Sequence, residues 1–100
     1  MPELLTPEEV SAALAVLPGW TGDTERIERQ LVLSREDADA LRAQVAAYAD
    51  EVDHHPVVTQ DDGALTFTVW THSAGGVTRK DIALAKAISE RAAPYLGPEA

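Results

Sequence analysis

Apolar positions along this chain follow two spacings, one typical of helices and one typical of strands. Apolar side chains recur every three or four positions over residues 7–17, 35–53 and 79–92, which predicts three amphipathic helices. Residues 26–33 and 65–70 instead carry apolar, β-branched or aromatic residues at alternate positions. This alternation predicts strands with one buried face, and Leu65, Phe67 and Val69 are expected to face the core.

Capping and breaking residues set the bounds of these elements. A threonine or serine precedes each helix and an acid follows it three positions later, in the pairs Thr6/Glu9, Ser34/Asp37 and Thr78/Asp81, which is the capping-box spacing. Breakers close the helices at Pro18-Gly19, at Pro56 and at Pro94 with Gly97-Pro98. Short strands are expected over 20–24 and 57–60, with a turn at 61–63 and a flexible loop over 71–76.

The resulting order is helix, strand, strand, helix, strand, strand, helix. Two hairpins separated by a helix favour an α+β fold, in which a four-stranded antiparallel sheet has three helices packed on one face. One hundred residues without a linker or repeat predict a single domain over residues 1–100. Trp20 follows the first helix directly, and we expect it to act as a packing anchor.

Charge and composition narrow the function. The net charge is −9, with 17 acidic and 8 basic residues scattered among each other, so direct binding to nucleic acid is not expected. The chain has no cysteine, which excludes disulfides and thiolate chemistry. No apolar run approaches the roughly 20 residues of a membrane span. The first residues lack signal-peptide character, and we expect a cytoplasmic protein.

The three histidines are the candidate catalytic residues. His54 and His55 are adjacent at the end of the second helix, and His72 follows the strand that ends at Trp70. Imidazole can give and take a proton near neutral pH. Because Pro56 forces His55 out of the helical conformation, the two neighbouring imidazoles are expected to converge on one pocket.

Four blocks of this sequence resemble the pterin-4a-carbinolamine dehydratase family. They are Leu17-Pro18-Gly19-Trp20, Asp50 with His54-His55-Pro56, Thr71-His72, and Gly76-Val77-Thr78 with Asp81 and Leu84-Ala85. The resemblance covers nearly the whole chain. Departures from the family pattern are Asp62, where an aromatic is usual, Leu31, Leu33 and Leu41 in place of aromatics, and an aspartate in place of the more frequent glutamate at position 50.

The resemblance implies dehydration of a 4a-hydroxytetrahydropterin to quinonoid dihydropterin and water, as part of pterin recycling and without a cofactor or metal. His54 and His72 are the acid–base candidates, and His55 is expected to orient the pterin and share the proton work. Asp50, one helical turn before His54, is expected to accept a hydrogen bond from that imidazole. The substrate pocket is expected to be lined by Asp53, Pro56, Trp70, Thr71 and Ser73.

Several alternatives remain open. Asp81 fits a capping role, which we favour over a role in the site. Three histidines are also a possible zinc ligand set, although the adjacent pair chelates poorly. A different class of function is a dehydratase-like module, catalytically relaxed, that acts as a protein assembly or dimerisation partner. The resemblance and an exposed edge strand both favour a homodimer or homotetramer.

Overall fold

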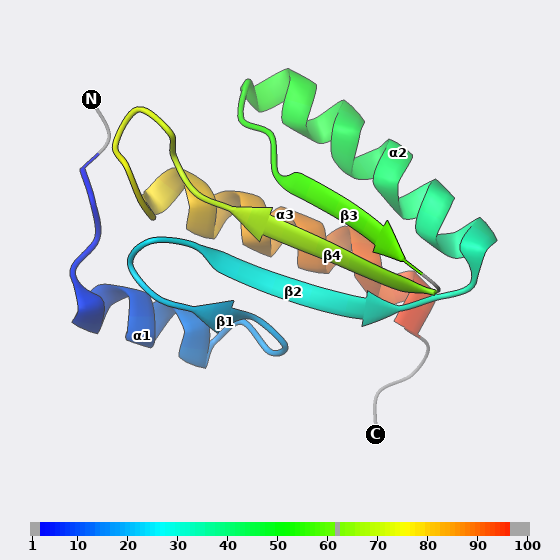
Figure 1. Ribbon diagram of the computed structural model, residues 1–100, viewed down its shortest axis with the longest axis horizontal. Coiled ribbons are helices and arrows are strands. Elements are labelled where there is room, and N and C mark those ends of the chain that lie inside the picture. Colours follow the sequence, from blue (N-terminus) through cyan, green and yellow to red (C-terminus); the bar gives the residue numbers. More distant parts are fainter. Residues whose placement is uncertain (1–2, 62, 97–100) are drawn as a thin grey trace.

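The predicted order of elements is confirmed in the computed structural model, which describes residues 3–61 and 63–96 (Figure 1). The helices are α1 (Pro7–Ala15), α2 (Arg35–Val52) and α3 (Arg79–Leu96). The strands are β1 (Thr21–Gly22), β2 (Ile27–Val32), β3 (Val57–Asp61) and β4 (Ala64–Val69). Among the described residues, no helix has the length and apolar character needed to cross a bilayer.

The four strands form one antiparallel sheet in the order β1-β2-β4-β3. Ile27 of β2 lies opposite Val69 of β4, and Val57 of β3 lies opposite Thr68. The two hairpins therefore meet through their longest strands, β2 and β4. This order leaves β3 at one edge of the sheet, with β4 as its only partner strand within the described residues.

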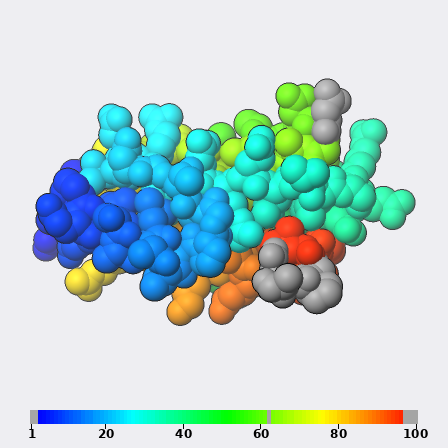
Figure 2. All heavy atoms as spheres, turned by 90° about the horizontal axis from the view of Figure 1, so that it is seen from below, coloured from blue at the N-terminus to red at the C-terminus, as the bar shows by residue number. Residues whose placement is uncertain are grey.

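One face of the sheet carries the core. Leu65, Phe67 and Val69 have no exposed surface, which confirms the alternation predicted for this strand. The buried face of α3, made by Leu84, Ala85, Ile88 and Ala92, belongs to the same apolar cluster. Seen from below, cyan and green atoms of the sheet region lie above the blue atoms of α1 and the orange to red atoms of α3 (Figure 2), so these two helices lie on the same side.

The helix starts follow the capping residues. Thr6 and Glu9 form a reciprocal capping box at α1, and the Ser34 hydroxyl accepts a hydrogen bond from the Asp37 amide at α2. Trp20 is buried, and its indole Nε1 donates to Ser89 Oγ at 2.8 Å. The anchor role predicted for this tryptophan is confirmed, and its polar contact is with α3.

The last helix ends within the stretch predicted from Pro94 and Gly97-Pro98, since α3 continues past Pro94 to Leu96. Proline removes one hydrogen bond near the helix end, where few remain to be lost. The last turn is held by packing instead. Tyr95 and Leu96 contact the apolar core, and Gln44 of α2 donates a hydrogen bond to the Tyr95 hydroxyl. The predicted breaker Gly97-Pro98 lies outside the described residues.

Candidate active site

The end of α2 sets the directions of the two adjacent histidines. Asp53 adopts a left-handed conformation with φ 52° and ψ 44°, and it is the only non-glycine residue with positive φ in the described part of the chain. The backbone amides of Asp53 and His54 both donate to the Ala49 carbonyl. This closes the helix in the manner of a left-handed C-terminal cap and turns the chain before His54.

His54 points into the protein and pairs with Asp81 of α3. Its Nε2 lies 2.5 Å from Asp81 Oδ1, and the side chains are 14% and 0% exposed. The predicted hydrogen bond between Asp50 and His54 is therefore wrong. That prediction assumed a regular helix through residue 54, whereas the left-handed Asp53 rotates His54 away from the helix face that carries Asp50.

Asp81 is held by a buried hydrogen-bond network. Its Oδ2 accepts from the Thr71 hydroxyl at 2.9 Å and from the Thr78 backbone amide at 2.8 Å. The Thr71 and Thr78 hydroxyls lie 2.8 Å apart. Since Thr71 gives its hydroxyl hydrogen to Asp81, the Thr78 hydroxyl donates to Thr71. Asp81 thus closes the first turn of α3, as the capping role predicted, and also holds His54.

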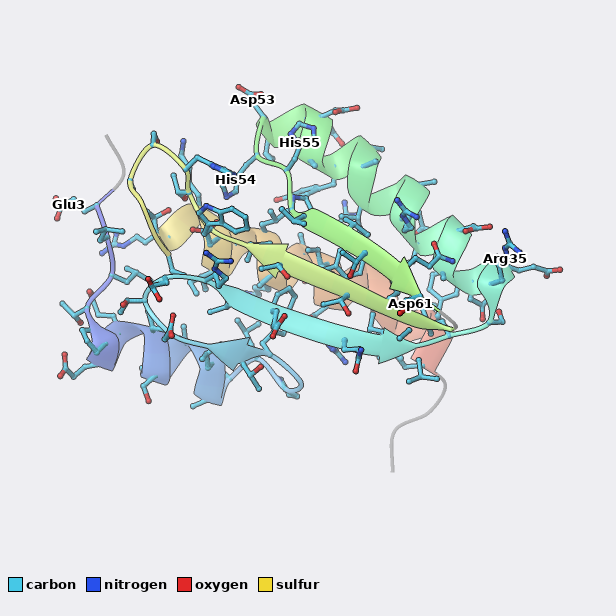
Figure 3. The ribbon with its side chains drawn as sticks, viewed as in Figure 1. Glu3, Arg35, Asp53, His54, His55 and Asp61 are labelled. Carbon is cyan, nitrogen blue, oxygen red and sulfur yellow. The ribbon has the colours of Figure 1, made fainter. Side chains whose placement is uncertain are left out.

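His55 makes a similar pair in a different environment. Its Nε2 lies 2.8 Å from Asp50 Oδ1, and the two side chains are 54% and 76% exposed. Figure 3 shows His54 between the end of α2 and the loop after β4, while His55 lies beside α2 and Asp53 points outward. The neighbouring imidazoles have separate partners, so the predicted convergence on one pocket is not seen in their contacts.

His72 rests on Trp70 at the end of β4. The two ring centroids are 4.6 Å apart, with the planes tilted by 42°. The guanidinium of Arg26 lies 4.9 Å from the centroid of the same indole. Trp70 is half-buried and His72 is exposed. The indole is thus in contact with both an imidazole and a cation.

The loop after β4 is tightly bonded. The Thr71 amide donates to the Gly76 carbonyl at 2.9 Å, and the Val77 amide donates to the Thr24 carbonyl at 2.8 Å. Gly75 has φ 77°, a positive value that favours glycine. Gly76 is required for a different reason, because a Cβ there would lie 2.5 Å from the Thr24 carbonyl oxygen. The loop predicted to be flexible is therefore closed by hydrogen bonds at its base.

The remaining predicted pocket residues are spread around this loop and the end of α2. Ser73 and Asp53 are exposed, Pro56 is half-buried, and Thr71 is buried with its hydroxyl engaged by Asp81. Asp62, one of the departures from the family pattern, lies outside the described residues. Of the predicted set, only His54 and Thr71 join the Asp81 network, and Trp70 joins His72 instead.

An apolar cavity borders His54 on the side of the helices. It has a volume of about 260 Å³ and is lined, besides His54, by Tyr48 and Val52 of α2 and by Lys80, Ala83 and Leu84 of α3. His54 thus combines a buried partner with accessible space beside it. Within residues 3–61 and 63–96, no three histidine, cysteine or acidic side chains are grouped closely enough to hold a metal ion.

The family model for pterin 4 alpha carbinolamine dehydratase matches residues 3–91 of this chain. A relative from Mycobacteroides abscessus is 42% identical over 87 residues, covering 85% of this chain and 92% of the relative. One from Streptomyces coelicolor is 43% identical over 95 residues, covering 93% and 94%. Both are named "Putative pterin-4-alpha-carbinolamine dehydratase".

A solved structure gives the same result for the fold. The crystal structure of a transcriptional coactivator/pterin dehydratase from Brucella melitensis superimposes with a TM-score of 0.83 at 35% identity, covering 88% of this chain and 97% of that one. The chain belongs to the pterin 4 alpha carbinolamine dehydratase family.

Sequence reasoning missed the partner of His54 and the neighbour of Trp70. Asp81 is 27 positions from His54, so helical spacing gave no signal for the pair. Its place in the last of the four family blocks was a signal of a role in the site, but the capping role seemed sufficient to explain that place. Arg26 was counted as one of the scattered cations. Only the pairing of β2 with β4 brings it next to Trp70.

Proposed function

We propose that this protein dehydrates 4a-hydroxytetrahydropterins to quinonoid dihydropterins by histidine acid–base catalysis. The observation that carries the proposal is the contact between His54 and the buried carboxylate of Asp81. Family membership supplies the reaction class, and this contact supplies a group able to move a proton. The relatives' names support the same activity.

In this proposal the proton of His54 lies on Nε2, facing Asp81. An ionised carboxylate only accepts hydrogen bonds, and Asp81 Oδ2 already accepts two. His54 therefore donates from Nε2 to Oδ1. This leaves Nδ1 as the atom that accepts or delivers a proton, while the aspartate fixes the tautomer and the orientation of the ring. The arrangement resembles the base and orienting acid of other acid–base enzymes.

Dehydration needs one proton delivered and one removed. The bond between C4a and the hydroxyl oxygen breaks as an acid protonates the departing oxygen, which leaves as water. A base takes the proton lost from the ring nitrogen bonded to C4a, and the new double bond forms between that nitrogen and C4a. Acid and base then exchange one proton to restore the starting enzyme. Acid–base help of this kind is worth on the order of 10²–10⁴-fold in rate.

The other two histidines complete the assignment. His72 serves with His54 in the proton transfers, because neither of its ring nitrogens bonds to another described residue. His55, exposed and held by Asp50, orients the pterin at the rim. The 260 Å³ cavity beside His54 is smaller than the usual ligand pocket of roughly 300–1,000 Å³, so the substrate is expected to bind largely at the surface.

The test is stopped-flow dehydration of 4a-hydroxytetrahydropterin by the wild type and by His54→Gln. Glutamine keeps an amide that can donate to Asp81 but cannot exchange protons near neutral pH, so folding is preserved while catalysis is lost. We expect kcat to fall by about 10²-fold or more, with the unfolding temperature close to that of the wild type. A folded His54→Gln variant with the wild-type rate would refute the assignment.

A second candidate function is a protein assembly or dimerisation module. The relative of known structure is described as a transcriptional coactivator as well as a pterin dehydratase, and β3 of this chain leaves one sheet edge open. The same experiment separates the two candidates. Well-folded wild type that gives no acceleration over the uncatalysed reaction excludes the enzyme and leaves the module.

A further inference from the structure

His72 is held through its ring rather than through its nitrogens. Among the described residues, no side-chain hydrogen bond reaches either ring nitrogen, and the ring contacts the Trp70 indole at a centroid distance of 4.6 Å. An imidazole that transfers protons must keep its nitrogens available for substrate. Ring contact with an aromatic neighbour restrains the orientation of such an imidazole without occupying them.

Trp70 in turn is in contact with Arg26. The pairing of β2 with β4 reaches Ile27 opposite Val69, one position from Arg26 and Trp70, and the guanidinium lies 4.9 Å from the indole centroid. Directly opposed side chains on antiparallel strands are the pairs that interact most closely. Trp70 follows the buried Val69 and is only half-buried itself, so its indole is incompletely packed. A cation over the ring limits the remaining motion of this side chain.

We infer that Arg26 is a positioning residue, which orients His72 for proton transfer through the indole of Trp70. The inference rests on the proposed function for its kinetic consequence. Arg26 does not touch the reacting atoms in this scheme. It belongs to the connection between β1 and β2, so the contact links that hairpin to the loop that carries His72.

The test compares Arg26→Ala, Arg26→Lys and a matched control, Arg35→Ala, in the dehydratase assay. Arg35 is an exposed arginine at the opposite end of α2 from His54 (Figure 3). For Arg26→Ala we expect kcat to fall about fivefold to tenfold, because small misplacements of a catalytic group are costly, with KM and the unfolding temperature little changed. Arg26→Lys keeps a cation over the ring and is expected to recover most of the rate.

A second readout does not depend on turnover. The ring protons of His72 lie near the indole, so their NMR shifts report the stacking directly. We expect Arg26→Ala to move these resonances toward those of an unstacked histidine and Arg35→Ala to leave them unchanged. Unchanged His72 resonances and kcat in Arg26→Ala would overturn the inference. If the wild type proves inactive, the proposed function fails separately, and the His72 resonances still decide whether Arg26 positions the ring.

Discussion

Two histidines adjacent in the sequence each pair with an aspartate, yet the two pairs are built differently. His54 and Asp81 are 14% and 0% exposed, whereas His55 and Asp50 are 54% and 76% exposed. The buried carboxylate accepts two further hydrogen bonds that hold it in place. Water screens the exposed pair and competes for its hydrogen bonds. The comparison shows that burial and surrounding donors, rather than the pair itself, fix one of these histidines more firmly than the other.

The largest difference is expected on removal of each carboxylate. Asp81→Ala leaves His54, the Thr71 hydroxyl and the Thr78 amide without their acceptor in a buried site, and we expect a loss of about 3 kcal/mol in the free energy of unfolding. Asp50→Ala is the matched control, with an expected change below about 1 kcal/mol. Urea denaturation measures both. Equal losses in the two variants would contradict the distinction drawn between the pairs.

A smaller effect is expected when one donor to Asp81 is removed. Thr71→Val keeps the shape of the side chain but deletes the hydroxyl that donates to Oδ2, and we expect it to cost about 1–2 kcal/mol. Thr59→Val, at an exposed position on β3, is the control and should change stability little. If Thr71→Val unfolds at the same urea concentration as the wild type, the network does not hold Asp81 as argued.

The smallest effect is expected at the turn between the two pairs. Asp53→Gly relieves the strain of an aspartate held at positive φ. This relief is expected to exceed the entropic cost of glycine's greater freedom in the unfolded chain, which gives a net stabilisation of about 0.5 kcal/mol. The midpoint of thermal or urea unfolding measures it. Asp53→Ala provides the opposite test, since alanine keeps the strain without the polar side chain and should destabilise. A destabilised Asp53→Gly variant would mean that the aspartate side chain itself stabilises the turn.

Much of the fold was predictable because it depends on local patterns. Leu65, Phe67 and Val69 follow strand alternation, and Thr6 and Ser34 mark helix starts through bonds to residues three positions away. The sequence placed the end of α3 only between Pro94 and Gly97-Pro98, because packing of Tyr95 and Leu96 extends the helix past the proline and no local pattern records that packing.

The candidate site was less predictable because it depends on contacts between residues that are far apart in the sequence. The three histidines were identified from the sequence, but their partners depend on tertiary structure. One left-handed residue, Asp53, redirects His54 from Asp50 to Asp81, and aspartate in this conformation carries no distinctive sequence signal. Strand pairing brings Arg26 next to Trp70, although the two residues are 44 positions apart in the sequence.

The double use of Asp81 affects how relatives of this chain are to be judged from their sequences. The same carboxylate closes the first turn of α3 and holds His54. Asp81 closes that turn whether or not a relative is catalytic, so its retention alone is weak evidence of activity. In the proposed mechanism His54 carries the proton, so an aspartate kept beside a lost histidine would mark a relative without the proposed activity.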